Sequence, residues 1–342
     1  MIEKPQEILK KYWGHTSFRP KQEDIINNVL SGKDSIALLP TGGGKSICFQ
    51  LPSILLEGIT IVVSPLIALM KDQVLSLQEK GIKALAITSG IKYSELDTLL
   101  DNCIYGNYKL LYLSPERLQQ ELVQERIKQM NVSLIAIDEA HCISQWGHDF
   151  RPAYRNIISI RKPENYRDKS LPPIIALTAT ATPKVLTDIT ELLDIKNAQL
   201  FQTSYHRPNL TYSIEHTTDK FYELDLLISK TTGSTIVYVR NRKATVNTAH
   251  FLNTRGIKTG FYHGGMSRED RHKQYLKWRS NEIQVIVGTN AFGMGIDKAD
   301  VDLVIHMEIP DSIENYFQEA GRAGRAGQKA IAKLLYLSLI HI

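Results

Sequence analysis

The chain has 342 residues, of which 43% are hydrophobic and 23% charged, and its formal net charge is +5. This length accommodates two domains of ordinary size, and the composition excludes a disordered or fibrous protein. The small basic surplus favours a polyanionic partner without requiring one.

Short β-branched and aliphatic runs alternate with longer helical patterns through the first half of the chain. Such alternation is typical of βαβ units, and nearly continuous apolar runs indicate strands covered on both faces by helices. The strands predicted in this half are 35–39, 59–64, 84–88, 110–114, 134–138 and 174–178.

The same alternation returns in the second half, with predicted strands at 234–239, 259–263, 284–288 and 303–307. Ser267, followed three residues later by Asp270, predicts a capping box at the start of a helix. Residues 206–209 interrupt the pattern, so we place the domain boundary there. The predicted fold is α/β, with domains 1–206 and 207–342, each a mostly parallel sheet flanked by helices.

The three cysteines, Cys48, Cys103 and Cys142, form no CxxC pair. Neither a disulfide framework nor a four-cysteine zinc site can be built from them, so no zinc is expected. No apolar stretch approaches the ~18 residues of a membrane span, and the N-terminus does not resemble a signal peptide. We expect an intracellular protein with no membrane partner.

A glycine-rich loop, Leu-Pro-Thr-Gly-Gly-Gly-Lys-Ser at 39–46, lies between a predicted strand and a predicted helix. Its glycines let backbone N–H groups turn toward a phosphate, Lys45 can reach terminal phosphates, and Ser46 can ligate Mg²⁺. The predicted nucleotide-binding residues are Thr41, Gly42, Gly43, Gly44, Lys45 and Ser46. The alternative is a flexible loop beside a surface lysine.

Two adjacent carboxylates, Asp138 and Glu139, follow the apolar strand predicted at 134–138. Ligands bind at the carboxyl ends of parallel strands. Asp138 is therefore a candidate to hold Mg²⁺, and Glu139 to orient or deprotonate the water that attacks a γ-phosphate. Taken alone, the pair is also compatible with a solvated loop entrance.

Near the end of the second half, the segment 316–327 contains Gln318, Arg322 and Arg325. A guanidinium from a second domain contributes ~10³–10⁵ in rate to known phosphoryl-transfer sites. We predict a catalytic role for all three residues. A contact with a nucleic-acid backbone is the alternative for one of the two arginines.

The order of these sites is similar to that in superfamily 2 helicases, and the amino-acid sequence over residues 8–327 resembles the RecQ family. The resemblance implies two RecA-like domains, ATP with Mg²⁺, and 3′-to-5′ travel on DNA. The segment 18–22 resembles the family's adenine-recognition motif, so the resemblance implies that Gln22 and Arg19 contact the adenine. It also implies that His15, just before this segment, lies against the base. It also makes Asp138–His141 a DEAH box, with His141 catalytic, and places Asp297 at the nucleotide.

Further segments resemble the family's strand-binding and coupling motifs: 63–73, 177–182, 262–266 and 287–297. The segment 141–152 resembles its aromatic-rich loop, in which an indole and a phenyl ring can stack on bases of any sequence. A core-packed aromatic cluster is the alternative for that loop. The DNA-contacting or coupling residues implied are Ser64, Lys71, Trp146, Phe150, Arg151, Thr178, Thr180, His263 and Thr289.

The resemblance implies a helicase acting in DNA recombination and repair, with single-stranded and duplex DNA as partners. We expect a monomer that contacts single-strand-binding or repair proteins, in the cytoplasm at the nucleoid if bacterial or in the nucleus if eukaryotic. The family's zinc and winged-helix modules have no counterpart after Gly327, so we expect a truncated second domain ending in an apolar tail. The alternatives are a translocase without unwinding, a non-catalytic binding module and a small-molecule kinase.

Overall fold

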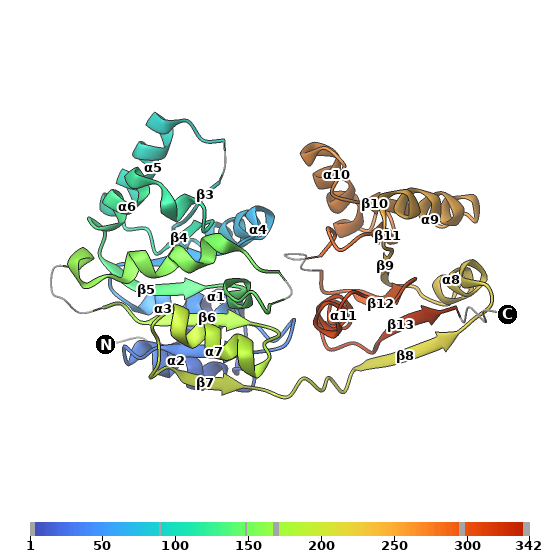
Figure 1. The fold of residues 1–342 in the computed structure, drawn as a ribbon, viewed down its shortest axis with the longest axis horizontal. Helices are drawn as coiled ribbons and strands as arrows, with labels where there is room; N and C mark the ends of the chain where they lie inside the picture. Colours follow the sequence, from blue (N-terminus) through green and yellow to red (C-terminus); the bar gives the residue numbers. More distant parts are fainter. Residues whose placement is uncertain (1–3, 89, 148, 167–170, 294–297, 338–342) are drawn as a thin grey trace. The chain divides into compact units, whose positions relative to one another are not determined.

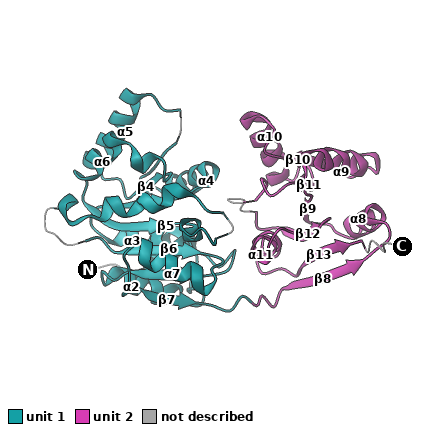
Figure 2. Cartoon of the chain, viewed as in Figure 1, with its two compact units in different colours: residues 1–205 teal, residues 206–342 magenta. Residues whose placement is uncertain are grey.

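The computed structural model describes residues 4–88, 90–147, 149–166, 171–293 and 298–337. The chain divides into two compact units, Met1–Tyr205 and His206–Ile342 (Figure 2). The boundary expected from the sequence lies one residue further along the chain.

Unit 1 contains a sheet whose strands run in the order β3-β4-β2-β5-β6-β1-β7, with every pairing parallel (Figure 1). Neighbouring residues of one strand pack on opposite faces: Ile61 and Val63 lie in one hydrophobic core, and Val62 lies in another. The sheet is therefore buried on both sides. Its strands are β1 Ser35–Leu38, β2 Ile59–Val63, β3 Ala84–Ile87, β4 Leu110–Leu113, β5 Val132–Ile137, β6 Ile174–Thr178 and β7 Gln199–Gln202.

Helices and short 3₁₀ segments connect these strands and cover the sheet (Figure 1). The α-helices are α1 Pro5–Trp13, α2 Gln22–Leu30, α3 Ile47–Leu55, α4 Ile67–Glu79, α5 Tyr93–Tyr105, α6 Glu121–Ile127 and α7 Pro183–Leu192. The 3₁₀ segments are η1 Arg117–Gln119, η2 Ala140–Ile143, η3 Pro152–Arg161 and η4 Pro163–Asn165. Among the described residues, no helix combines the length and apolar character needed to cross a membrane.

Unit 2 contains a second parallel sheet, in the order β10-β11-β9-β12-β13-β8. Its two faces are also buried, since Val237 packs in one core and its neighbours Ile236 and Tyr238 in the other. The strands are β8 Leu210–His216, β9 Ser234–Tyr238, β10 Thr259–Tyr262, β11 Val285–Gly288, β12 Val301–His306 and β13 Ala330–Tyr336. The helices are α8 Lys220–Ser229, α9 Arg242–Thr254, α10 Arg268–Arg279 and α11 Ile313–Ala320.

These two sheets confirm the predicted fold class. The helix start predicted at Ser267 is also confirmed, because the Ser267 hydroxyl accepts a hydrogen bond of 3.0 Å from the Asp270 N–H and α10 begins at Arg268. Three strands, β7, β8 and β13, were not predicted. Of the predicted apolar tail, Leu334 and Leu335 are buried in β13, between β12 and β8, and residues 338–342 lie outside the described residues.

Candidate nucleotide and nucleic-acid sites

The glycine-rich loop joins β1 to α3. Gly42 and Gly44 adopt left-handed backbone conformations, with φ of 78° and 77°, which glycine adopts without strain. The Gly43 N–H donates to the Pro40 carbonyl at 2.9 Å, and Lys45 Nζ donates to the Leu39 carbonyl at 3.3 Å. The loop thus closes on itself just before α3, and the Lys45 side chain reaches back to the start of the loop.

The segment predicted to read adenine contacts this loop directly. Gln22, which is 2% exposed, donates from Nε2 to the Gly44 carbonyl at 3.0 Å and accepts at Oε1 from the Arg19 N–H at 2.8 Å. The Arg19 guanidinium donates to the Gly42 carbonyl. His15 is exposed in the connection between α1 and α2. Two of the three predicted adenine-reading side chains therefore hold the loop's carbonyl groups.

The two acids follow β5 directly. Asp138 is 6% exposed, and its Oδ2 accepts a hydrogen bond of 3.4 Å from the Ser64 hydroxyl. Burial and the neighbouring charge of Glu139 raise the pKa of Asp138 to about 7, whereas the positive charge of Lys45 opposes this rise. Asp138 and Lys45 are therefore close enough to interact, as expected for two loops at one edge of a parallel sheet.

The residues expected to hold Mg²⁺ offer oxygen donors. Magnesium is commonly held by one or two carboxylates together with phosphate oxygens and water, and Ser46 and Asp138 fit that set. The buried negative charge of Asp138 beside Glu139 also favours a cation. Leaving aside the undescribed positions, no group of three or more His, Cys, Asp or Glu side chains is placed to hold a metal ion.

A buried histidine connects the acids to the next strand. His141 Nδ1 lies 2.9 Å from Thr178 Oγ1 and 3.4 Å from Glu139 Oε2. The Thr178 hydroxyl donates its proton to the Thr180 carbonyl, so Nδ1 must be the donor to Thr178 Oγ1. Thr178 also accepts from the Thr180 N–H at 3.3 Å. Hydrogen bonds thus join the catalytic candidate His141 to the coupling candidates Thr178 and Thr180, and a contact of 3.4 Å adds the Glu139 carboxylate to the series.

The indole of the aromatic-rich loop lies outside the hydrophobic core. Trp146 is 65% exposed, so the core-packed alternative is wrong for this residue. Phe150 is half-buried, with the Arg155 guanidinium 5.1 Å from its ring centre. Arg151 donates to the Pro65 carbonyl at 3.1 Å, and Lys71 is exposed on α4. The indole is thus available for stacking.

In unit 2, the predicted catalytic residues lie at the end of α11 and in the turns after it. Gln318 and Arg322 are 8% and 5% exposed, and Arg325 is half-buried. Burial raises the pKa of the Tyr238 hydroxyl, and a hydrogen bond from Arg322 opposes that rise. The Arg322 guanidinium therefore lies at the carboxyl end of β9.

The remaining candidates in unit 2 follow β10 and β11. His263 stacks on Phe261, with ring centres 5.9 Å apart. Thr289 is 7% exposed, and its hydroxyl accepts from the Ala291 N–H at 3.3 Å. Asp297 lies outside the described residues. The described candidates of unit 2 thus follow β10 and β11, or lie in α11 and the turns after it.

Three polar residues near the site were missed by the sequence analysis. Gln73 donates to the Ser46 hydroxyl at 3.3 Å and accepts from Gln50 at 3.4 Å, so it fixes the predicted Mg²⁺ ligand. The Tyr154 hydroxyl donates to the Asp138 carbonyl at 2.9 Å. Gln73 falls in the resemblance segment 63–73, which could have identified it. Tyr154 and Gln50 carry no local signal.

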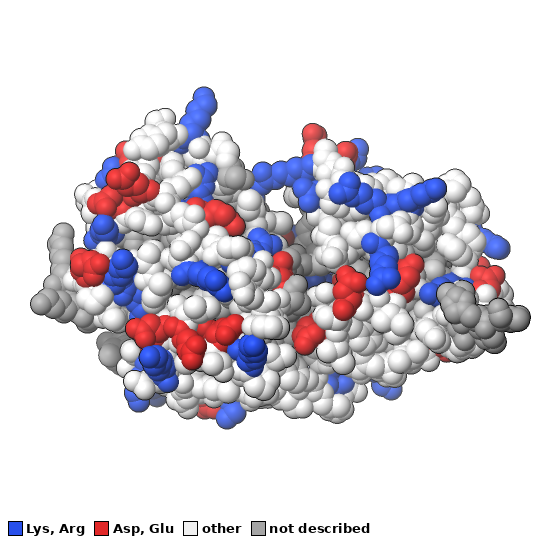
Figure 3. All heavy atoms as spheres, in the orientation of Figure 1, with Lys and Arg blue, Asp and Glu red and all other residues white. Residues whose placement is uncertain are grey.

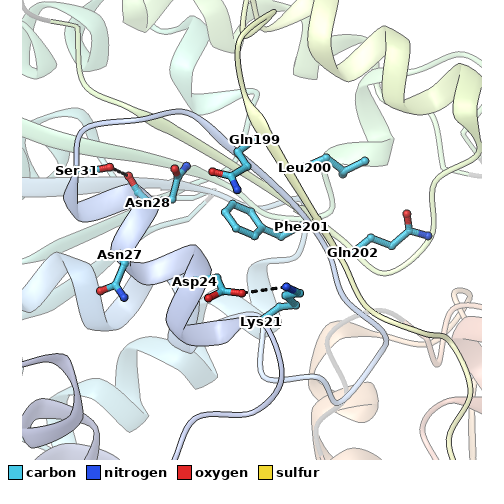
Figure 4. A pocket seen from close by; sticks show the side chains of 9 residues that line it. All are labelled: Lys21, Asp24, Asn27, Asn28, Ser31, Gln199, Leu200, Phe201 and Gln202. Carbon is cyan, nitrogen blue, oxygen red and sulfur yellow. Dashed lines mark hydrogen bonds and ion pairs between the residues drawn. The ribbon is translucent and has the colours of Figure 1, made fainter.

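Surface charge and cavities give little further guidance. On the face drawn in Figure 3, Lys and Arg are interspersed with Asp and Glu on each unit. A groove of about 790 Å³ lies between α2 and β7, lined by polar side chains including Lys21 and Asp24, whose charged atoms are 3.0 Å apart (Figure 4). None of the predicted site residues lines this groove, so it is separate from the nucleotide site.

Comparison with known proteins assigns the family. The DEAD/DEAH box helicase family matches residues 19–189, and the helicase conserved C-terminal domain matches 219–327. The ATP-dependent DNA helicase RecQ of Synechocystis is 41% identical over 331 residues, which cover 95% of this chain and 69% of that protein. The chain belongs to the RecQ family of helicases. This assignment excludes the small-molecule kinase.

Other RecQ-family proteins are longer than this chain. The probable ATP-dependent DNA helicase RecS of Bacillus subtilis and the RecQ of that organism are each 43% identical, over 97% and 98% of this chain. The chain spans 66% and 56% of their respective lengths. Among solved structures, the helicase MrfA bound to DNA has a TM-score of 0.82 at 20% identity, covering 98% of this chain and 51% of that one. The structural match supports the helicase fold.

Proposed function

We propose that this RecQ-family chain is an ATP-dependent DNA helicase that moves 3′ to 5′ along a single strand and unwinds duplex DNA. The observation that carries the proposal is the acid pair after β5: buried Asp138 interacts with Lys45 of the glycine loop, and Glu139 is joined through His141 to Thr178. A phosphate loop, an acid pair and a coupling segment at one sheet edge are what a nucleotide-driven motor requires.

In the hydrolytic step, the backbone N–H groups of 41–46 and the Lys45 ammonium bind the phosphates of ATP. Ser46 and Asp138 would hold Mg²⁺, which would neutralise negative charge on the phosphates when bound. The oxygen of the attacking water bonds to the γ-phosphorus, and Glu139 accepts a proton from that water. The bond from the γ-phosphorus to the β–γ bridging oxygen of ATP breaks, which gives ADP and inorganic phosphate. His141 holds the Glu139 carboxylate, and Arg19, Gln22, His15 and Asp297 contact the rest of the nucleotide.

Unit 2 supplies positive charge in this proposal. Arg322 and Arg325 stabilise the charge that develops on the transferred phosphoryl group, and Gln318 orients it. A contact of one arginine with the DNA backbone remains the alternative. The proposal therefore makes hydrolysis depend on residues from both units.

The proposed DNA contacts are mostly with the backbone and carry little sequence information. Trp146 and Phe150 stack on bases, Arg151, Lys71 and Ser64 contact the strand from unit 1, and His263 and Thr289 contact it from unit 2. Thr178 and Thr180 couple hydrolysis to movement. We further propose a monomer working in recombination and repair, with single-strand-binding or repair proteins as partners, at the nucleoid of a bacterium or in a eukaryotic nucleus.

A second candidate is a DNA-stimulated ATPase that translocates without unwinding. It is favoured by the length comparison, because the chain spans 66%, 56% and 54% of the first three relatives. Each duplex step costs a mean of ~1.4 kcal/mol to separate, so under this second candidate unwinding needs a wedge from outside this chain.

Strand separation on 3′-tailed and 5′-tailed duplexes, beside ATP turnover on the same DNA, tests the proposal. Unwinding of the 3′-tailed duplex alone supports it. Turnover without strand separation supports the translocase, whereas DNA binding without turnover identifies a non-catalytic binding module.

A further inference from the structure

The exposed indole of Trp146 is partly covered by a charge. The Lys184 ammonium, on the first turn of α7, lies 3.7 Å from the centre of the Trp146 ring. This distance is well within the range of a cation–π contact. A base that stacks on the covered face must first displace Lys184, although the indole remains 65% exposed.

A second residue of α7 holds the same segment of the loop. The Ser144 hydroxyl, fully buried, donates to the Asp188 carboxylate and accepts from the Trp146 N–H at 3.1 Å. Lys184 and Asp188 are four residues apart, so they lie on one face of the helix. Gly147 closes the segment against His141, because a Cβ at this position would lie 2.3 Å from the His141 carbonyl oxygen. The loop is therefore docked on α7 at two points.

Both ends of this docking lead to the hydrolytic residues. The loop continues from η2, which begins directly after Glu139. On the other side, α7 has Thr182 as its N-cap, four residues after Thr178. The Thr182 hydroxyl accepts a hydrogen bond of 3.4 Å from the Val185 N–H. A change in the docking of Trp146 thus acts on segments that begin at the acid pair and at the coupling strand.

We propose that Lys184 and Asp188 form a latch, which holds the Ser144–Trp146 segment on α7. Single-stranded DNA opens this latch by competing for the indole. The inference rests on the proposed function, because it assigns Trp146 as the base-stacking residue. Lys184 and Asp188 are then positioning residues: they set the concentration of strand at which stimulation begins, without touching ATP.

The direction of the effect separates the latch from the ordinary role of a surface lysine. A lysine that contacts DNA phosphates increases affinity, so its removal weakens binding and reduces the dependence on salt. A lysine that blocks the indole decreases affinity, so its removal strengthens binding. An exposed cation–π contact contributes about 0.5–1 kcal/mol, which converts to about a two- to fivefold change in affinity.

The first experiment measures the concentration of a single-stranded oligonucleotide that gives half-maximal ATPase stimulation. Lys184→Ala is expected to lower this concentration about two- to fivefold, and Lys184→Arg, which keeps a cation over the ring, to restore the wild-type value. Lys196→Ala, an exposed lysine just after α7, is the matched control and leaves it unchanged. In a Trp146→Ala background, Lys184→Ala has no effect, because the contact is already absent.

The second experiment needs neither ATP nor DNA. The fluorescence of Trp146, obtained by subtracting the Trp146→Phe signal, is quenched with acrylamide in wild type and in Lys184→Ala. Easier quenching in the variant supports the latch. Unchanged quenching overturns it. The latch is also overturned if Lys184→Ala raises the oligonucleotide concentration needed for half-maximal stimulation and does so in the Trp146→Ala background as well. Wild-type protein that shows no DNA stimulation overturns the proposed function, whereas the quenching result still decides whether Lys184 covers the indole.

Discussion

The two units share one architecture and differ in the side chains at the carboxyl ends of their strands. Unit 1 places a glycine loop with Lys45 beside two acids there, whereas unit 2 places Arg322 beside the Tyr238 hydroxyl. The contrast extends to the acids. Asp138 has an acid as its neighbour, whereas Glu319 of unit 2 pairs with His306 at 2.9 Å. The fold is repeated, and the loops make the chemistry different.

The proposed function gives each unit one part of a single reaction. In that proposal, unit 1 supplies phosphate binding and water activation, and unit 2 supplies positive charge for the transition state. Substitutions in the two units should therefore have distinct kinetic signatures.

The largest effect is expected from unit 2. Changing both Arg322 and Arg325 to Ala should reduce the ATPase rate constant by ~10³–10⁵ while leaving ATP bound to unit 1, because the arginines act on the developing charge. Single-turnover hydrolysis and binding of a fluorescent nucleotide measure the two quantities. The matched control is Arg255→Ala, an exposed arginine after α9. Hydrolysis within tenfold of wild type would contradict the division of roles.

A smaller loss is expected from the water-activating residue of unit 1. Glu139→Gln should retain nucleotide binding and reduce hydrolysis by ~10²–10⁴, the usual contribution of a general base. Lys45→Ala, by comparison, should lose binding itself. Isothermal titration with a non-hydrolysable nucleotide distinguishes the two variants. If Glu139→Gln hydrolyses ATP as fast as wild type, another group activates the water.

Much of this comparison was accessible from the sequence, and the reason lies in burial. Strands such as β1 and β2, whose residues are all buried, give continuous apolar runs. In β7 only Phe201 is buried, and β8 is largely exposed, so neither gives such a run. Both are edge strands, whose outer sides pair with no strand of their sheet.

The site divides in the same way. The glycine loop is one continuous stretch of sequence, and the acid pair is another. The chemistry of each can therefore be predicted from residue type and order. The contact of Gln22 with Gly44 spans 22 positions of sequence, and that of Ser144 with Asp188 spans 44 positions. No local pattern encodes such pairings, because the fold brings the residues together.

The DNA-sensing part of unit 1 should give an intermediate effect. Trp146→Ala removes a stacking platform worth ~1–3 kcal/mol per base, so about a five- to 150-fold higher concentration of single strand should be needed for half-maximal stimulation. ATPase titration with an oligonucleotide measures this concentration. Trp146→Phe, which keeps an aromatic ring, is the control. Unchanged stimulation of the alanine variant would remove Trp146 from the sensing role.

The smallest effect concerns stability and follows from the raised pKa of Asp138. Because the folded protein binds this proton more tightly than the unfolded chain, ionised Asp138 destabilises the fold increasingly as the pH rises from about 4 to about 7. In the absence of nucleotide and Mg²⁺, Asp138→Asn should therefore raise Tm at pH 8, on the order of 5 °C, with little gain at pH 4.

Thermal unfolding at a series of pH values measures this difference, with exposed Asp24→Asn as the control. An equal gain at pH 4 and pH 8 would show that the substitution acts through packing and not through charge.

The most direct test of the whole account is the steady-state ATPase rate of the full chain with and without saturating single-stranded DNA. We predict measurable turnover that increases several-fold with the strand and is lost in the Arg322→Ala, Arg325→Ala double variant. Turnover that is the same with and without DNA, and the same in wild type and double variant, would contradict the proposal that strand-dependent hydrolysis needs residues of both units.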